Sequence, residues 1–126
     1  MRAVDTNVLV RLLARDDAKQ VAAAEAFVQG GAWISHLVLV ESLWVLDSVY
    51  EVKPAQIAAG VEMLLDHDAL VVQDADTVKL ALDHFRKRPR LGFSDCLILA
   101  VAQQAGHVPL ATFDRELARL PDTRRL

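Results

Sequence analysis

The chain has 126 residues, of which 53% are hydrophobic, enough to form the core of one domain but too few residues for two. A net charge of −3 excludes a simple basic nucleic-acid binder, and 25% charged residues exclude a disordered chain. The single cysteine excludes an internal disulfide and a cysteine-rich zinc site. No apolar run reaches the ~18 residues of a membrane span, and early charged residues leave no signal peptide, so we expect a cytoplasmic protein.

In the first half of the chain, short extended segments alternate with segments of helical periodicity. Gly30 and Gly31 predict the end of one helix, and Pro54 predicts the first turn of another. We expect a strand at 3–4, a helix after Asp5, a helix from 17 to 28, a strand at 32–34, and helices over 37–50 and 54–66.

The second half of the chain has the same alternation. Ser94 predicts the N-cap of an apolar helix, and Gly106 predicts its end. We expect a strand at 69–72, helices over 74–87 and 95–105, a strand at 109–111 and a last helix over 114–120. Short apolar strands separated by helices predict an α/β fold, with a parallel sheet flanked by helices, in one domain over residues 1–126.

Asp5 and Asp114 each follow an expected strand and precede an expected helix. Ligands of open parallel sheets bind at the carboxyl ends of the strands, so both residues lie where sites occur. An aspartate before a helix is also a frequent N-cap, and for each residue alone this structural interpretation is favoured. Asp95 lies in the first turn of its helix, where it interacts favourably with the helix dipole, but Ser94 already supplies a cap.

Glu41 is the acid that a structural role explains least well. Its neighbours one helical turn away are large and apolar, and no Lys or Arg lies between Val38 and Glu51 to pair with it. We therefore expect a dehydrated carboxylate that needs a distant basic side chain, a raised pKa, or a cation shared with other acids. Carboxylate oxygens suit Mg²⁺ or Mn²⁺ and not zinc.

Four segments together resemble the PIN-domain ribonucleases, particularly the VapC-type toxins of bacterial toxin–antitoxin pairs. They are the segment 4–9 around Asp5, Glu41 in an apolar helix, Ser94-Asp95 before an Ala-rich helix, and the segment 106–114 that ends at Asp114. The resemblance covers essentially the whole chain in order. No single motif is specific, and the Asp-Thr-Asn triplet at 5–7 alone is weak; the four together are strong.

The resemblance implies a single Rossmann-like three-layer domain whose parallel sheet has the order 3-2-1-4-5. It implies a Mg²⁺ or Mn²⁺ site formed by Asp5, Glu41, Asp95 and Asp114, with Thr112 and Asn7 as supporting polar residues. Members of this family cleave RNA, often tRNA or rRNA, commonly form homodimers, and are silenced by an antitoxin protein. We expect Asp5 and Asp95 to be direct ligands, and Glu41 and Asp114 to bind the metal directly or through water.

Two basic clusters flank these acids in the sequence. Either they are ordinary solvated surface or they bind RNA phosphates beside the acidic site. The candidate RNA-binding residues are Arg86, Lys87, Arg88, Arg90, Arg115 and Arg119. The four histidines receive no catalytic role, since histidines in such positions are usually solvated.

Two other kinds of function stay open. A receiver-like phospho-acceptor domain also gathers aspartates at sheet ends, but it needs a lysine on a late strand, where this chain has Leu110-Ala111-Thr112. A catalytically inactive PIN domain that only binds RNA or protein is the other alternative. A phosphohydrolase with an aspartyl intermediate would need an acid in place of Asn7.

Overall fold

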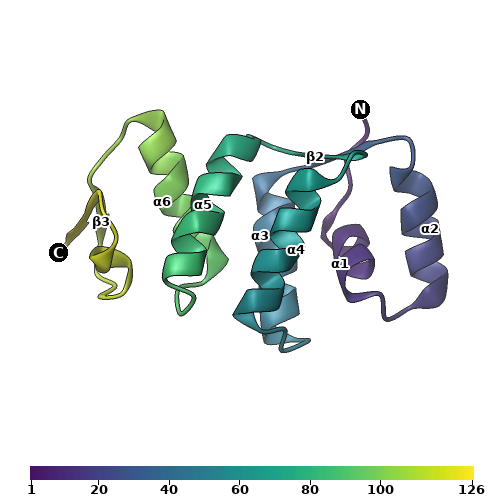
Figure 1. Cartoon of the computed structure of the whole chain (residues 1–126), viewed down its shortest axis with the longest axis horizontal. Helices are drawn as coiled ribbons and strands as arrows, with labels where there is room; N and C mark the ends of the chain where they lie inside the picture. Colours follow the sequence, from purple (N-terminus) through teal and green to yellow (C-terminus); the bar gives the residue numbers. More distant parts are fainter. The chain divides into compact units, whose positions relative to one another are not determined.

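The computed structural model describes all residues, Met1–Leu126, which form an α/β fold of six α-helices and short strands (Figure 1). The chain divides into two compact units, Met1–Ala75 and Asp76–Leu126. The first unit contains α1 (Thr6–Ala14), α2 (Ala18–Val28), β1 (Ala32–Ile34), α3 (His36–Ser48), α4 (Pro54–Asp66) and β2 (Leu70–Val72). The second contains α5 (Ala75–Lys87) except its first residue, α6 (Phe93–Ala105), β3 (Leu110–Thr112), the 3₁₀ helix η1 (Leu117–Arg119) and β4 (Thr123–Arg125).

Side chains at the helix starts explain where the helices of the first unit begin. Asp17 accepts a hydrogen bond from the Gln20 N–H at 3.0 Å, and the Ser35 hydroxyl accepts one from the Val38 N–H at 3.1 Å. These bonds satisfy backbone donors that have no partner within the helix. The expected ends of α2 and α4 are confirmed, whereas α3 ends at Ser48, two residues earlier than expected.

Parallel pairing in the first unit joins three segments that are distant in sequence. β1 pairs with β2 over three residues, and Ala3 forms an isolated bridge with Trp33 on the other side of β1. The Trp33 N–H donates to the Arg2 carbonyl at 2.8 Å, which fixes the segment that leads into Asp5. The expected strand at 3–4 is thus reduced to a single bridge.

In the second unit, β3 pairs with β4 in parallel, so a strand does form after Leu120. The rings of Phe85 and Phe93 meet edge to face, with centroids 5.8 Å apart, and connect the end of α5 to the start of α6. The described pairings therefore form two two-stranded sheets and one bridge, and they do not confirm a five-stranded sheet of order 3-2-1-4-5. The single domain over 1–126 also stays a prediction.

Two expected helix boundaries in this unit are wrong. α6 begins at Phe93 after Gly92, and Ser94 lies inside the helix and makes no cap hydrogen bond. The expected helix over 114–120 is only the 3₁₀ turn η1, because Pro121 disfavours the helical conformation at the residue before it, Leu120, which is extended.

The core of the first unit explains the apolar side chains on one side of α3. Leu39, Leu43 and Leu46 are buried at helical spacing, whereas Leu37 and Trp44 on the other side are 81% and 63% exposed. Of the eight apolar side chains of this helix, the core therefore buries three. None of the helices has the length and apolar character required to cross a bilayer.

The different burial of two leucines in α3 leads to a testable prediction. Leu39→Ala should lower the free energy of unfolding by about 2–5 kcal/mol, because it leaves a cavity in the core. Leu37→Ala, the matched control two residues away, should change it by less than about 1 kcal/mol. Chemical denaturation measures both, and equal destabilisation would contradict the packing described here.

Candidate active site

Asp5 and Glu41 lie on neighbouring elements of the first unit. Asp5 is the N-cap of α1, and its Oδ1 accepts a hydrogen bond from the Val8 N–H at 3.1 Å. The next residue, Thr6, donates its hydroxyl proton to Oε2 of Glu41 at 3.2 Å, which connects α1 to α3. Each carboxylate thus uses one oxygen for a bond within the protein and keeps its second oxygen free of protein hydrogen bonds.

The carboxylate of Glu41 is not dehydrated, so the expectation from its apolar neighbours in the sequence is wrong. Glu41 is exposed, and its neighbours Leu37 and Trp44 are themselves largely exposed, so they do not remove water from the carboxylate. The reason is the orientation of α3, which turns its other apolar side to the core. Glu41 forms no ion pair with Lys or Arg, so a distant arginine does not neutralise it either.

Asp95 and Asp114 are electrostatically coupled in the second unit. Burial raises the pKa of Asp95 above its ordinary value, and the negative charge of Asp114 raises it further. Asp95 makes no side-chain hydrogen bond and no ion pair, and the N-cap of its helix is Gly92. The fold therefore gives this half-buried carboxylate no hydrogen-bonding partner, and its remaining favourable interaction is with the dipole of α6, in whose first turn it lies.

Asp114 does act as a local cap. Its Oδ1 accepts hydrogen bonds from the N–H groups of Glu116 at 2.8 Å and Leu117 at 2.9 Å. Its own N–H donates to the Thr112 hydroxyl at 3.0 Å, so Thr112 helps to fix the turn that carries this acid. The role expected for Thr112 as a supporting residue has this local structural basis.

The four acids are therefore arranged as two pairs, one in each compact unit. No group of three or more His, Cys, Asp or Glu side chains is placed to hold a metal ion. The four side chains nevertheless fit a hard cation, because they offer carboxylate oxygens that have no basic partner. Mg²⁺ keeps several of its water ligands, so it can bind where few protein ligands are present. Convergence of all four acids stays a prediction.

Asn7 is exposed in the first turn of α1 and makes no side-chain hydrogen bond in the protein. Together with Asp5 it lines a cavity between α1 and α2. The α2 residues of this cavity were not identified from the sequence. The spacing of these residues could have identified them, because positions i, i+3, i+4 and i+7 lie on one face of a helix. The four residues are Gln20, Ala23, Ala24 and Phe27.

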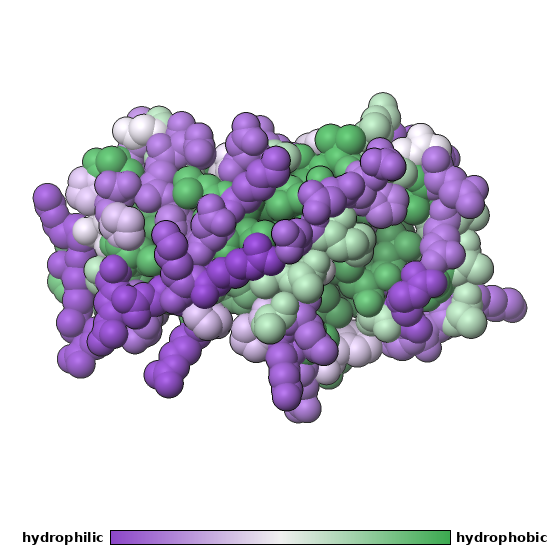
Figure 2. All heavy atoms as spheres, viewed as in Figure 1, coloured by the Kyte–Doolittle hydropathy of each residue, from purple (hydrophilic) through white to green (hydrophobic).

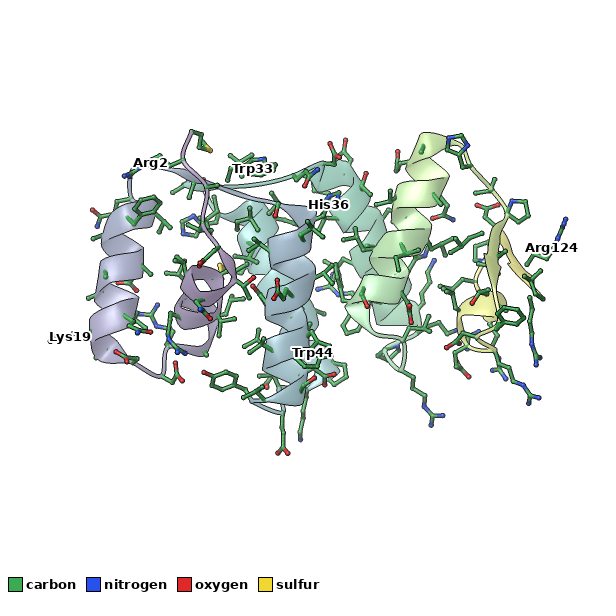
Figure 3. The ribbon with its side chains drawn as sticks, turned by 180° about the vertical axis from the view of Figure 1, so that it is seen from behind. Arg2, Lys19, Trp33, His36, Trp44 and Arg124 are labelled. Carbon is green, nitrogen blue, oxygen red and sulfur yellow. The ribbon has the colours of Figure 1, made fainter.

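The candidate RNA-binding residues all lie in the second unit. The first cluster extends from the end of α5 into the loop before α6, where Lys87 and Arg90 are exposed. In the second cluster, Arg115 is exposed and Arg119 lies 3.9 Å from Glu116 in a surface ion pair. Arg124 on β4 also projects from the ribbon into solvent (Figure 3). Binding of RNA by these residues stays a prediction.

Two of the four histidines are not simply solvated, whereas His67 and His107 are exposed, as expected from the sequence. His84 is buried, and its Nε2 lies 2.7 Å from Oε1 of Gln103 on α6. His36 binds the Gln73 carbonyl through Nε2 at 2.8 Å. Both side chains therefore connect elements of the fold, because each reaches a polar group on a neighbouring segment.

A protein-family model for the PIN domain matches residues 2–122, a range that includes all four acids and reaches into both compact units. No curated protein and no solved structure matches the chain. PIN domains are generally nucleases, hydrolases that act on nucleic acid, and they typically use divalent metals. The match is to the family as a whole and does not distinguish the VapC-type toxins within it. Because the match extends over nearly the entire sequence, this protein belongs to the PIN domain family.

Proposed function

We propose that the protein is a Mg²⁺- or Mn²⁺-dependent endoribonuclease that hydrolyses RNA phosphodiester bonds. The observation that carries the proposal is Asp95, a half-buried carboxylate with a raised pKa, next to the charge of Asp114 and without a basic partner. Such an arrangement costs stability unless a cation balances it, and residues with this property are typical of active sites. Membership of a family of nucleases supports the same conclusion.

The proposed metal ligands are Asp5, Glu41, Asp95 and Asp114. Asp5 and Asp95 bind directly, and Glu41 and Asp114 bind directly or through water. A bound Mg²⁺ supplies a Lewis acid and lowers the pKa of a water molecule, which is the chemistry that phosphodiester hydrolysis needs. The local hydrogen bonds support these roles, because Val8 orients Asp5, Thr6 orients Glu41, and the turn at Thr112 orients Asp114.

RNA is the proposed substrate, and the basic residues of the second unit bind its phosphates. These residues are Arg86, Lys87, Arg88, Arg90, Arg115 and Arg119. Four carboxylates repel an RNA chain, so positive charges outside the acidic site are needed to hold it there. Asn7 supports the site beside Asp5.

We further propose that the protein is the toxin of a cytoplasmic toxin–antitoxin pair, acts as a homodimer, and is silenced by an antitoxin protein. The resemblance of the acidic segments to VapC-type toxins supports this role, and the exposed apolar side chains of α3 support a protein contact. The absence of a lysine at Leu110–Thr112 and the family match both argue against a receiver-like domain.

Replacement of Asp95 by Asn tests the catalytic role. Asp95→Asn should keep the fold and lower the rate of Mn²⁺-dependent RNA cleavage by at least about a hundredfold, roughly 2.7 kcal/mol of transition-state stabilisation. Asp83→Asn, a change of the same kind at an exposed position of α5, should leave the rate unchanged. Cleavage of total RNA, with a chelator as a further control, measures the effect. Full activity of the Asp95 variant would place the site elsewhere.

The raised pKa of Asp95 predicts an unusual pH dependence of stability. Because the folded state binds the Asp95 proton more tightly than the unfolded state, stability falls as pH rises from the unfolded pKa through the folded pKa. In chelator at neutral pH, Asp95→Asn should therefore melt at a higher temperature than the wild type, and below the ordinary carboxyl pKa the two should melt alike.

Metal should reverse this order of stability. Mg²⁺ at a hundred times its Kd stabilises the wild type by about 2.7 kcal/mol, and the variant should gain far less because it has lost a ligand. Calorimetry at neutral pH, with and without the metal, measures both effects. Identical melting of the two proteins in chelator, or equal stabilisation by Mg²⁺, would contradict the proposed site.

Two lysines of α5 provide a matched test of RNA binding. In the Asp95→Asn background, where RNA stays intact, Lys87→Glu should weaken binding and reduce the salt slope of log K by at least about 0.7, the value of one phosphate contact on single-stranded RNA. Lys79→Glu makes the same charge change on the same helix outside the basic cluster. Fluorescence anisotropy at several salt concentrations measures the slopes. Equal effects of Lys87→Glu and Lys79→Glu would show that Lys87 makes no specific contact with RNA.

A further inference from the structure

A cavity of about 440 Å³ lies between α1 and α2, entirely within the first unit. This volume is in the roughly 300–1,000 Å³ range of small-molecule sites. Asp5 and Asn7 line it together with apolar side chains, so it adjoins one of the proposed metal ligands. The residues around it are Asp5, Asn7, Val8, Arg11, Gln20, Ala23, Ala24 and Phe27.

The sequence of α2 explains why there is a cavity here. Ala23 and Ala24 are too small to fill the space opposite α1, while Gln20 and Phe27 occupy the same helical face one turn to either side. The Arg2 guanidinium lies 3.9 Å from the centroid of the Phe27 ring and binds the Phe27 carbonyl, and in Figure 3 Arg2 is at the end of α2 opposite Lys19. Phe27 is therefore held in place as an aromatic part of the wall.

Charge in the cavity argues against an anionic ligand. The only cation in the wall is Arg11, whose guanidinium already binds Asp16 at 3.2 Å, the Tyr50 hydroxyl at 3.0 Å and the Gln20 side chain. Asp5 adds a negative charge that repels phosphate. The groups left to recognise a ligand are apolar surface, the aromatic ring of Phe27, the side-chain amide of Asn7 and Nε2 of Gln20, because Oε1 of Gln20 accepts the hydrogen bond from Arg11.

We propose that this cavity binds a nucleobase of the RNA substrate, and that Asn7, Gln20 and Phe27 determine which base is accepted. The inference rests on the proposed endoribonuclease function. A nucleobase is neutral, planar and bordered by hydrogen-bond donors and acceptors, which matches an apolar aromatic wall with two amides. Unpaired bases of RNA are recognised by stacking on aromatic or guanidinium groups together with hydrogen bonds to their edges.

The position of the cavity favours a base over a protein side chain as its occupant. Asp5 belongs both to the cavity wall and to the proposed metal site, so a nucleotide whose phosphate lies at the metal places its base within reach of α1 and α2. Figure 2 shows apolar surface interrupted by polar groups over these two helices, in agreement with a wall of mixed character. The cavity thus gives the enzyme a way to choose among RNA sequences.

Two alanines of α2 allow a matched test. Ala23→Leu fills the cavity, whereas Ala22→Leu makes the same change at the neighbouring exposed position, outside the cavity wall. Adenosine, guanosine, cytidine and uridine, which carry no phosphate for Asp5 to repel, are titrated separately into the ¹⁵N-labelled protein in chelator, and ribose is the control without a base. One nucleoside should shift the amide signals of Val8, Ala23 and Ala24 and bind at least about fivefold more weakly to Ala23→Leu. Ala22→Leu should bind it like the wild type.

Several results would overturn the inference. The first is binding that does not depend on the base, and the second is unchanged binding by Ala23→Leu. The third is binding of N-acetyl-tryptophanamide as tight as that of the best nucleoside, which would indicate a contact for a protein side chain. If Ala23→Leu does not fold, Gln20→Ala tests the inference instead, since it removes an amide from the wall and should reduce the difference in affinity among the four nucleosides.

Cleavage of a random single-stranded RNA distinguishes a failure of this inference from a failure of the proposed function. With Mn²⁺, the wild type and Ala22→Leu should show a base preference next to the cut, which Ala23→Leu loses. Cleavage without any such preference overturns the base site and leaves the nuclease intact. No cleavage by any of the three proteins overturns the nuclease, whereas the titrations in chelator still report on the base site.

Discussion

Backbone N–H groups orient two of the candidate acids, and the candidate site depends on these hydrogen bonds. Oδ1 of Asp5 accepts one from Val8, and Oδ1 of Asp114 accepts two, from Glu116 and Leu117. Capping and metal binding are often treated as alternative explanations of such an aspartate. Here they are compatible, because the bond fixes the side chain through Oδ1 and leaves Oδ2 without a protein partner. The stability gained from an N-cap, typically about 1 kcal/mol, also orients a residue that can serve in chemistry.

Asp95 shows the opposite relation between stability and function. It has no hydrogen-bond partner, its burial disfavours the charged form, and the nearby charge of Asp114 disfavours it further. A carboxylate with no structural function would be expected to lie in solvent or beside a basic group. The cation of the proposed metal site would offset this unfavourable environment of Asp95.

The sequence by itself determined the class of fold and most helix boundaries. Asp17, Ser35 and Pro54 begin helices as their local chemistry requires, because a cap or a first-turn proline acts on the nearest few residues. The acidic segments also indicated the family that the match over residues 2–122 shows. Local chemistry was insufficient at Ser94, where the chain starts α6 at Phe93 and packs that ring against Phe85.

Only the tertiary structure decided which side chains are exposed to solvent and which residues from distant segments lie next to each other. The surroundings of Glu41 looked apolar in sequence, yet the carboxylate is exposed, because α3 buries Leu39 and Leu43 on its opposite side. The cavity beside Asp5 exists because α1 and α2 face each other across two alanines, which are unremarkable in the sequence. A sequence specifies periodicity and caps over a few residues, whereas exposure and cavities depend on how distant helices pack.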